Sequence, residues 1–223
     1  MLTLHRAALV LPDPADPTAP SHVDGAVLVR DGLVEAVGPY AELAAAQPTA
    51  RVRDWGDALL APGLRHPDGH RLLERAYHPD PREELGDAPV PDGLVGETDE
   101  ARCGASARRG LQRMLGFGVT AVAGPFERAS VRTAVARSGL VALPGVGSPG
   151  PTGSLRSVGS PGSVEAVWSL DPLVGLPFAE AVHGRLVVGG RADFAVFAPG
   201  ADGPRAGGCR AAVLGGRLVF RRR

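Results

Sequence analysis

Two strong β-hairpin signals lie near opposite ends of this chain of 223 residues. Each joins two short apolar segments through a pair of turn residues: Asp31-Gly32 between residues 26–30 and 33–38, and Gly215-Gly216 between residues 211–214 and 218–220. Asp and Gly tolerate the positive φ that a type I′ turn requires. The pattern therefore predicts antiparallel β structure at both ends of the chain.

Further elements extend these two β-rich ends. Strands are predicted at residues 2–11, 51–60, 186–188 and 193–197. A short helix is predicted at residues 40–47, and Pro48 ends it because proline cannot continue a helix.

The middle of the chain has a different pattern. Residues 65–97 are rich in Pro, Asp and Gly, which predicts a loop with at most one helical turn around residues 72–77. Thr98 is the expected N-cap of a helix that ends before Gly116. A strand at 119–123, a helix at 126–137 and a strand at 140–143 then follow, an order typical of α/β proteins.

A Gly/Ser/Pro-rich segment at residues 144–163 has the composition of a flexible linker. Its two Gly-Ser-Pro-Gly segments lack the Gly-x-Ser-x-Gly form that would present a catalytic serine. Brief ordered segments are expected after it, at residues 164–169 and 177–182.

Composition narrows the possible functions. The 24 basic and 24 acidic residues balance, which argues against a nucleic-acid or membrane partner. Cys103 and Cys209 are far apart and the first apolar segment is short, so we expect reduced thiols in a cytoplasmic protein. The chain contains no lysine, which excludes lysine-based chemistry.

Several segments occur in the order found in metal-dependent amidohydrolases. They are Gly25 to Gly38, Ala61-Pro62-Gly63-Leu64, Gly110 to Gly124, Gly189 to Phe197, and Val213 to Val219. The chain resembles the imidazolonepropionases and related deaminases of that superfamily, including aminodeoxyfutalosine deaminases.

This resemblance implies a composite β-sandwich formed by the N- and C-terminal segments. A complete (β/α)8 barrel takes about 250 residues, more than the middle of the chain provides. We therefore expect an α+β fold, with the composite β-sandwich from residues 1–61 and 184–223. A reduced α/β remnant of the barrel, including the linker, would occupy residues 62–183.

The resemblance also implies a metal motif at residues 62–70. Alignment with the family pattern Pro-Gly-aliphatic-aliphatic-Asp-x-His-x-His puts His66 at the aspartate, Asp68 at the first histidine and His70 at the second. Relatives use a metal ion to lower the pKa of bound water to about 7. Asp68 and His70 are thus candidate ligands for zinc or another divalent metal, although two ligands do not hold a catalytic zinc.

Further ligands could come from His66, His78 or His183. We favour the interpretation that His66, Asp68, His70 and His78 are solvated loop residues, and we assign no catalytic residue.

Three functional hypotheses follow. In the preferred one, the chain is catalytically degenerate, binds no cofactor and acts by self-association or through a partner. In the second, it is a minimal metal-dependent hydrolase acting on C–N bonds, other than peptide bonds, of a small cyclic or nucleoside-like substrate. In the third, it is an accessory protein for a neighbouring pathway enzyme.

Overall fold

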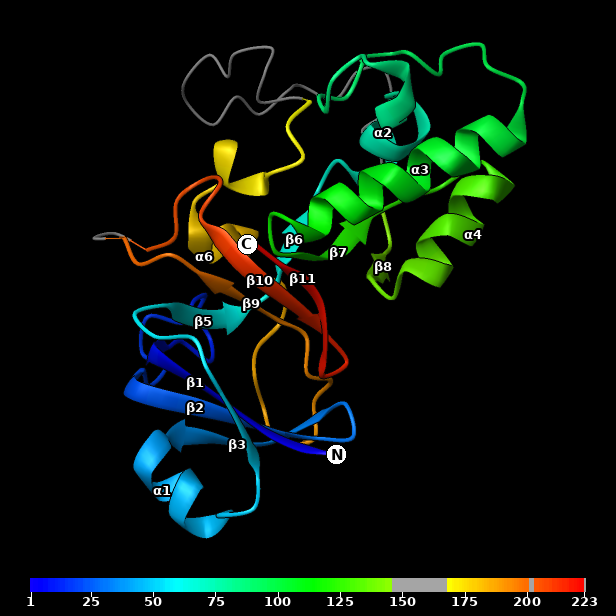
Figure 1. Ribbon diagram of the computed structural model, residues 1–223. Coiled ribbons are helices and arrows are strands. Elements are labelled where there is room, and N and C mark those ends of the chain that lie inside the picture. The colour runs from blue at the N-terminus through cyan, green and yellow to red at the C-terminus, as the bar shows by residue number, and fades with distance from the viewer. Residues whose placement is uncertain (146–167, 201–202, 223) are drawn as a thin grey trace. The chain divides into compact units, whose positions relative to one another are not determined.

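The computed structural model describes residues 1–145, 168–200 and 203–222 (Figure 1). They form two compact units. The first contains Met1–Arg65, Met114–Thr120 and Asp171–Arg223, and the second contains His66–Arg113 and Ala121–Leu170. Most of the predicted linker lies outside the described residues, as do residues 164–167 of the segment predicted at 164–169.

The first unit is built around an eight-stranded mixed sheet. Strands β1 (Leu2–Val10), β2 (His22–Arg30) and β3 (Leu33–Pro39) are consecutive and antiparallel. The turn between β2 and β3 has positive φ at Asp31 (50°) and Gly32 (88°), which confirms the hairpin predicted there. Strands β4 (Arg51–Asp54) and β5 (Leu59–Pro62) both run parallel to β1.

The C-terminal strands join the same sheet. They are β9 (Phe194–Phe197), β10 (Cys209–Leu214) and β11 (Arg217–Arg221), in the order β11-β10-β9-β5-β1-β2-β3. Antiparallel pairing of β5 with β9 connects the two ends of the chain. Gly215 and Gly216 have φ values of 51° and 73°, which confirms the second hairpin. Val29 and Val213 thus lie in one sheet.

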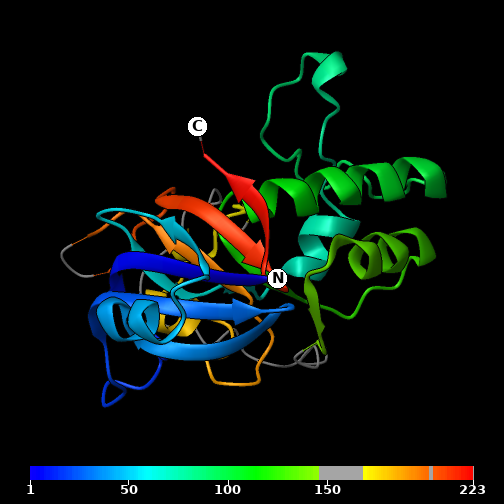
Figure 2. The ribbon, with the colours of Figure 1, turned by 60° about the horizontal axis from the view of Figure 1, so that its bottom comes forward.

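The sheet is covered differently on its two faces. Helix α1 (Tyr40–Ala46) lies against the N-terminal strands, where Leu4, Ala26 and Leu28 form a small cluster (Figures 1 and 2). A larger cluster collects residues from both ends of the chain, including the fully buried Phe194. Alternation along β2 fits this division, because successive side chains of a strand point to opposite faces: Ala26 and Leu28 join the small cluster, and Val27 and Val29 join the large one.

The prediction of a strand at residues 186–188 is wrong. Leu186 is buried and its N–H donates to Pro12 O, but Val187 and Val188 are exposed by 42% and 71%. A turn follows directly, since Gly190 N–H donates to Val187 O over 2.9 Å. The segment has no ladder partner, so its apolar run forms an irregular connection. Two short helical segments complete the unit: η2 (Pro172–Val174) and α6 (Phe178–Ala181).

The second unit contains helices around short strands. A three-stranded sheet has the order β6-β7-β8, with β6 at Leu64–His66, β7 at Val119–Ala123 and β8 at Val141–Leu143. The boundary between the two units falls within β6 and β7. Strands β7 and β8 are parallel. Helices α3 (Glu100–Leu115) and α4 (Ala129–Ser138) lie side by side (Figure 2), and α2 spans Gly69–Glu74.

Two local predictions in this unit need correction. Residues 65–97 contain more structure than a loop with one helical turn, because β6, α2 and the 3₁₀ helix η1 (Pro81–Glu83) lie there. The N-cap of α3 is Asp99, whose carboxylate accepts from Ala101 N–H over 2.9 Å. Thr98 instead donates its N–H to Glu97 Oε1. Asp99 is one residue closer to the helix than Thr98, so its carboxylate can accept hydrogen bonds from the free N–H groups of the first turn.

Among the described helices, none has the length and apolar character needed to cross a membrane.

Candidate functional site

Two of the family-like segments lie next to each other. Leu64 N–H donates to Gly118 O over 2.8 Å. A Cβ at Gly63 would lie 2.1 Å from Thr120 Cγ2, far inside van der Waals contact. The close approach of Gly63 and Thr120 therefore requires glycine, which gives this motif residue a packing role.

A third family-like segment supports the C-terminal hairpin. The carboxylate of Asp193 accepts from Gly215 N–H over 2.7 Å and lies 3.2 Å from Arg191 Nε. Burial raises the pKa of Asp193, while the bond from Gly215 and the charge of Arg191 act in the opposite direction. Asp193 thus holds the turn that joins β10 and β11.

His66 begins the metal-motif region and is 4% exposed. Its Nδ1 accepts from Asp68 N–H over 3.2 Å, and its Nε2 lies 2.9 Å from Ser169 O. Because Nδ1 is the acceptor, the proton is on Nε2, which donates to the carbonyl. Burial lowers the pKa of His66, and the Ser169 carbonyl and the Asp68 charge partly offset this effect. Both ring nitrogens are therefore engaged within the protein.

Asp68 and His70, the two candidate ligands, lie at the start of α2. Asp68 is the N-cap residue, but its carboxylate makes no capping hydrogen bond. The backbone is tightly packed here, since a Cβ at Gly69 would lie 2.8 Å from Ala123 O. His70 is half-buried, and its Nδ1 has no hydrogen-bond partner among the described residues. Nδ1 of His70 is thus a possible ligand atom that no described residue engages.

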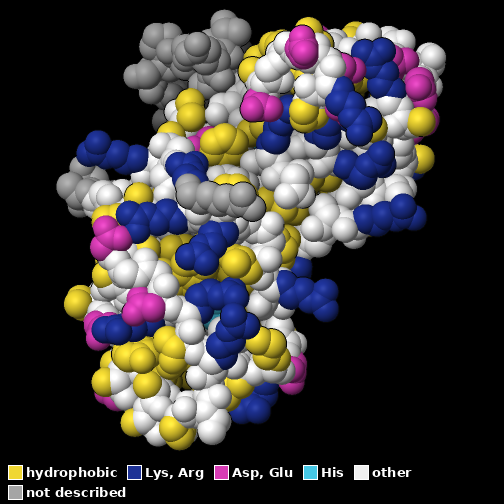
Figure 3. All heavy atoms as spheres, in the orientation of Figure 1, with side chains coloured by type: hydrophobic (Ala, Val, Ile, Leu, Met, Phe, Trp, Pro, Cys, Tyr) yellow, Lys and Arg dark blue, Asp and Glu magenta, His cyan; other side chains and the backbone are white. Residues whose placement is uncertain are grey.

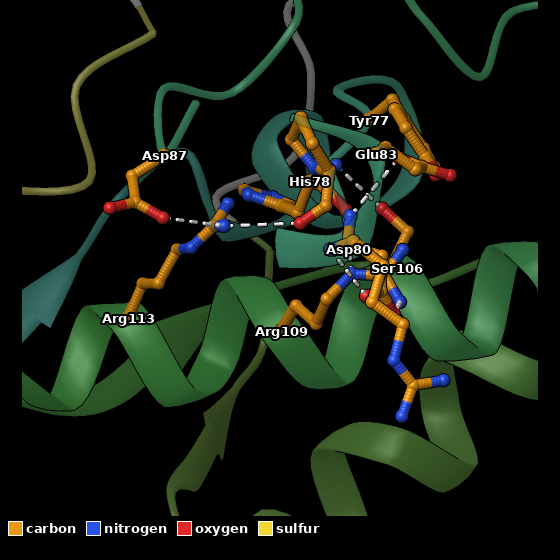
Figure 4. A network of polar contacts seen from close by, with 10 residues as sticks. Tyr77, His78, Asp80, Glu83, Asp87, Ser106, Arg109 and Arg113 are labelled. Carbon is orange, nitrogen blue, oxygen red and sulfur yellow. Dashed lines mark hydrogen bonds and ion pairs between the residues drawn. The ribbon is translucent and has the colours of Figure 1, made fainter. Parts of the chain in front are cut away.

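His78 is fully buried between α2 and α3 (Figure 4). Its Nε2 donates to Leu72 O over 2.8 Å, and its backbone N–H donates to Ser106 Oγ over 2.8 Å. Arg109 Nε donates to His78 O over 2.7 Å. Burial is the main reason that the pKa of His78 falls to about 4, so the ring is neutral. His78 connects the loop to α3. The prediction that His66 and His78 are solvated loop residues is therefore wrong, since both side chains are buried.

His183 belongs to the first compact unit, whereas Asp68 and His70 belong to the second. Its backbone N–H donates to Gly63 O over 2.8 Å. Burial lowers the pKa of His183, Asp193 opposes the change and Arg65 adds to it.

A catalytic zinc site needs three protein ligands and a fourth position for water or substrate. Within residues 1–145, 168–200 and 203–222, no group of three or more His, Cys, Asp and Glu side chains could hold a metal ion. Asp68 stands where the motif has its first histidine, and His66 uses both nitrogens in hydrogen bonds. The residues present do not fit a catalytic zinc, and the assignment of Asp68 and His70 as ligands stays a prediction.

The two thiols do not have the features of nucleophiles. Cys103 is buried, and Arg128 Nη1 donates to its Sγ over 2.9 Å. Burial raises the pKa of Cys103 and outweighs the effect of Arg128. Burial also raises the pKa of Cys209 to about 12. Reactive cysteines have lowered pKa values, so neither thiol is activated.

Sequence reasoning did not identify the interaction of His78 with α3. Ser106 and Gly110 are four residues apart and therefore lie on the same face of the helix. A Cβ at Gly110 would lie 2.6 Å from His78 Nε2, so this glycine makes room for the ring. The sequence signal for this contact was a glycine and a serine four residues apart in a segment of otherwise helix-favouring residues.

Comparison with known proteins identifies relatives of parts of the chain. Residues 25–50, which include the β2–β3 hairpin and α1, match the bacterial imidazolonepropionase-like composite domain. An imidazolonepropionase from Pyrobaculum arsenaticum is 37% identical over 70 residues, which cover 28% of this chain and 18% of that protein. A 5-methylthioadenosine/S-adenosylhomocysteine deaminase from Nitratidesulfovibrio vulgaris is 46% identical over 50 residues, covering 22% and 11%.

Among solved structures, guanine deaminase from Bradyrhizobium japonicum aligns with a TM-score of 0.46 and 21% identity, covering 64% of this chain and 34% of that chain. The chain thus spans less than half the length of each of these relatives. The resemblance inferred from the sequence is confirmed in these segments: residues 25–50 match an imidazolonepropionase-like composite domain, and segments of 70 and 50 residues are similar to an imidazolonepropionase and to a deaminase.

Proposed function

We propose that this protein is a catalytically degenerate relative of the imidazolonepropionase-like amidohydrolases. Residues 1–61 and 184–223 form its composite β-sandwich, and residues 62–183 form a reduced α/β remnant of the barrel. It acts through self-association or through a protein partner, without catalysing hydrolysis.

The observation that carries this proposal is the hydrogen bonding of His66. The ring lies within the metal motif, yet Asp68 N–H and Ser169 O occupy its two nitrogens. A histidine ligand must offer one unprotonated ring nitrogen to the metal. Binding through His66 would therefore break the contact with Asp68 and leave a backbone N–H without its partner.

The self-association half of the proposal rests on strand β8. It stands at the end of its sheet, and among the described residues it pairs only with β7. The side chain of Ala142, in the middle of β8, is exposed. A closed barrel has no free strand edge, whereas a partial sheet offers unpaired N–H and C=O groups to another chain.

Metal analysis tests the loss of catalysis. Wild-type protein and an Asp68→Ala/His70→Ala variant are purified without chelators, and zinc, iron and manganese are measured per chain by mass spectrometry. We expect no stoichiometric metal in either protein. Stoichiometric metal that the double variant loses, while a His22→Ala control keeps it, would contradict the proposal.

Light scattering after size-exclusion chromatography tests self-association. We expect wild-type protein to form oligomers as its concentration rises, and Ala142→Lys to shift it toward monomer, because lysine on a strand edge opposes pairing. Ala45→Lys, an equally exposed alanine substitution on α1, is the matched control. A wild-type monomer at every concentration leaves only the partner-binding half of the proposal.

A second candidate is a minimal metal-dependent hydrolase or deaminase acting on C–N bonds, other than peptide bonds, of a small cyclic or nucleoside-like substrate. One observation favours it: the carboxylate of Asp68 makes no capping hydrogen bond at the start of α2, and Nδ1 of His70 has no hydrogen-bond partner among the described residues. The same metal analysis separates the two candidates.

A further inference from the structure

A pocket in the first compact unit lies apart from the metal motif in sequence and belongs to no family-like ligand set. Its volume is about 680 Å³, within the range of about 300–1,000 Å³ that is usual for small-molecule sites. Its walls come from β1, β2 and β4 on one side and from the β10–β11 hairpin on the other. We call it the His5 pocket.

His5 lines this pocket and is 0% exposed. Its ring stacks on Trp55 with centroids 6.1 Å apart and meets the edge of Phe194 at 4.9 Å. Neither ring nitrogen has a hydrogen-bond partner among the described residues. Buried polar atoms are nearly always hydrogen-bonded, so two unused nitrogens in a pocket wall indicate a missing partner.

Strand register places a positive charge beside this ring. In the parallel pairing of β1 with β4, His5 is opposite Arg53, and the half-buried Arg53 also lines the pocket. Arg217, from β11, also lines the pocket. Within the described part of the chain, no ion pair joins either arginine to an acidic group.

The acidic residue that lines the pocket does not neutralise the charges of Arg53 and Arg217. Asp31 is the acidic residue of the pocket wall, and it pairs with the N-terminal amine of Met1. Burial lowers the pKa of Arg53, and the nearby charges of Arg51 and Arg221 lower it further. Figure 3 shows basic side chains, all arginines because the chain lacks lysine, gathered between the β10–β11 hairpin and the N-terminus.

We propose that the His5 pocket binds a small organic anion. Its carboxylate or phosphate group pairs with Arg53 and Arg217, its apolar part packs against Val29 and Leu218, and a neighbouring polar atom hydrogen-bonds to His5. Guanidinium groups suit both kinds of anion because their N–H groups match the spacing of the oxygens.

The state of the imidazole fits this role. Burial, with a smaller contribution from Arg53, lowers the pKa of His5 to about 3. The ring is neutral at pH 7 and offers one N–H donor and one acceptor. It adds no charge to the pocket, so the arginines recognise the anion and His5 recognises the atom beside it.

Isothermal titration of the 223-residue protein with four probes tests the proposal: benzoate, phenyl phosphate, inorganic phosphate and the neutral benzyl alcohol. We expect benzoate or phenyl phosphate to bind, and to bind more tightly than inorganic phosphate or benzyl alcohol. Whichever of the two aromatic anions binds more tightly identifies the anionic group. Equal binding of inorganic phosphate, equal binding of benzyl alcohol, or no binding at all would overturn the proposal.

Variants locate the binding. Arg53→Gln/Arg217→Gln should weaken binding of the organic anion about tenfold or more, because two charge-assisted hydrogen bonds are lost. Arg185→Gln changes an exposed arginine outside the pocket and should leave binding unchanged. Equal losses in both proteins would overturn the proposal. Circular dichroism establishes folding, and the outcome is independent of metal at Asp68 and His70.

Discussion

His5 and His66 are both buried histidines, one in each compact unit, and their surroundings differ in the feature that decides what a histidine can bind. His66 lies in a family-like metal motif, and both of its nitrogens are hydrogen-bonded within the protein. His5 lies on a strand outside that motif, and both of its nitrogens lack partners among the described residues. Position in a motif therefore indicates ancestry, whereas unused donor and acceptor atoms indicate binding capacity.

The largest expected effect comes from His66→Ala. The substitution removes a buried ring together with its hydrogen bonds to Asp68 N–H and Ser169 O, so we expect a loss of about 3 kcal/mol in the free energy of unfolding. Urea denaturation followed by circular dichroism measures it. His22→Ala, which alters a half-buried ring without a described hydrogen bond, should cost about 0.5 kcal/mol or less. A similarly small cost at His66 would break the comparison, because the ring would then be available for another role.

Gly110→Ala should have a smaller effect in the same unit. The added methyl group would lie 2.6 Å from His78 Nε2, in a region where the ring already donates to Leu72 O. We expect a loss of about 2 kcal/mol from overpacking, although alanine is the better helix former. Thermal denaturation checks it, with Gly175→Ala as the control because its added Cβ meets nothing within 4 Å. An increase in stability would mean that α3 and His78 are less tightly packed than the 2.6 Å distance implies.

His5→Phe should have the smallest effect and the opposite sign. Phenylalanine keeps the ring between Trp55 and Phe194 but removes two buried polar atoms without partners, so we expect a gain of about 1 kcal/mol at pH 8. Urea denaturation of both proteins measures the gain. A loss of stability would show that the nitrogens of His5 have partners in solution, which would remove its contrast with His66.

The same variant has a pH signature. The pKa of His5 is about 3 in the folded protein and 6.5 as its ordinary value, so between these values the unfolded chain binds a proton that the folded chain does not. This depressed pKa makes the wild type lose stability as pH falls from 6.5 toward 3. His5→Phe lacks that contribution, and its advantage should grow over this range, as parallel denaturation series at pH 8, 6 and 5 can measure. A constant difference would contradict the shift.

Local patterns explain which parts of the fold could be predicted. Asp31-Gly32 and Gly215-Gly216 determine their own turns, and the α3–β7–α4–β8 order follows from short-range periodicity. Residues 186–188 had the apolar character of a strand, but a strand also needs a neighbour to pair with, and that neighbour is a property of the whole fold. Secondary structure in residues 65–97 was missed because its helices are short and rest on tertiary contacts.

The candidate sites show the same limit. Asp68 and His70 could be named from a contiguous motif, and their role as ligands stays a prediction. The His5 pocket could not be named, because it depends on the register that brings Arg53 beside His5 and on a hairpin more than 200 residues further along the chain. No short-range pattern carries that information.

The pairing of β5 with β9 has a consequence for biosynthesis. Residues 1–62 leave the ribosome first, but the strand that completes their sheet, Phe194–Phe197, is translated more than 130 residues later. Until then β5 has an open edge, and the whole second unit is translated in the interval. The nascent chain therefore exposes a sheet that lacks its C-terminal strands while other parts fold. Chaperone binding during this period would have its greatest effect on the yield of folded protein.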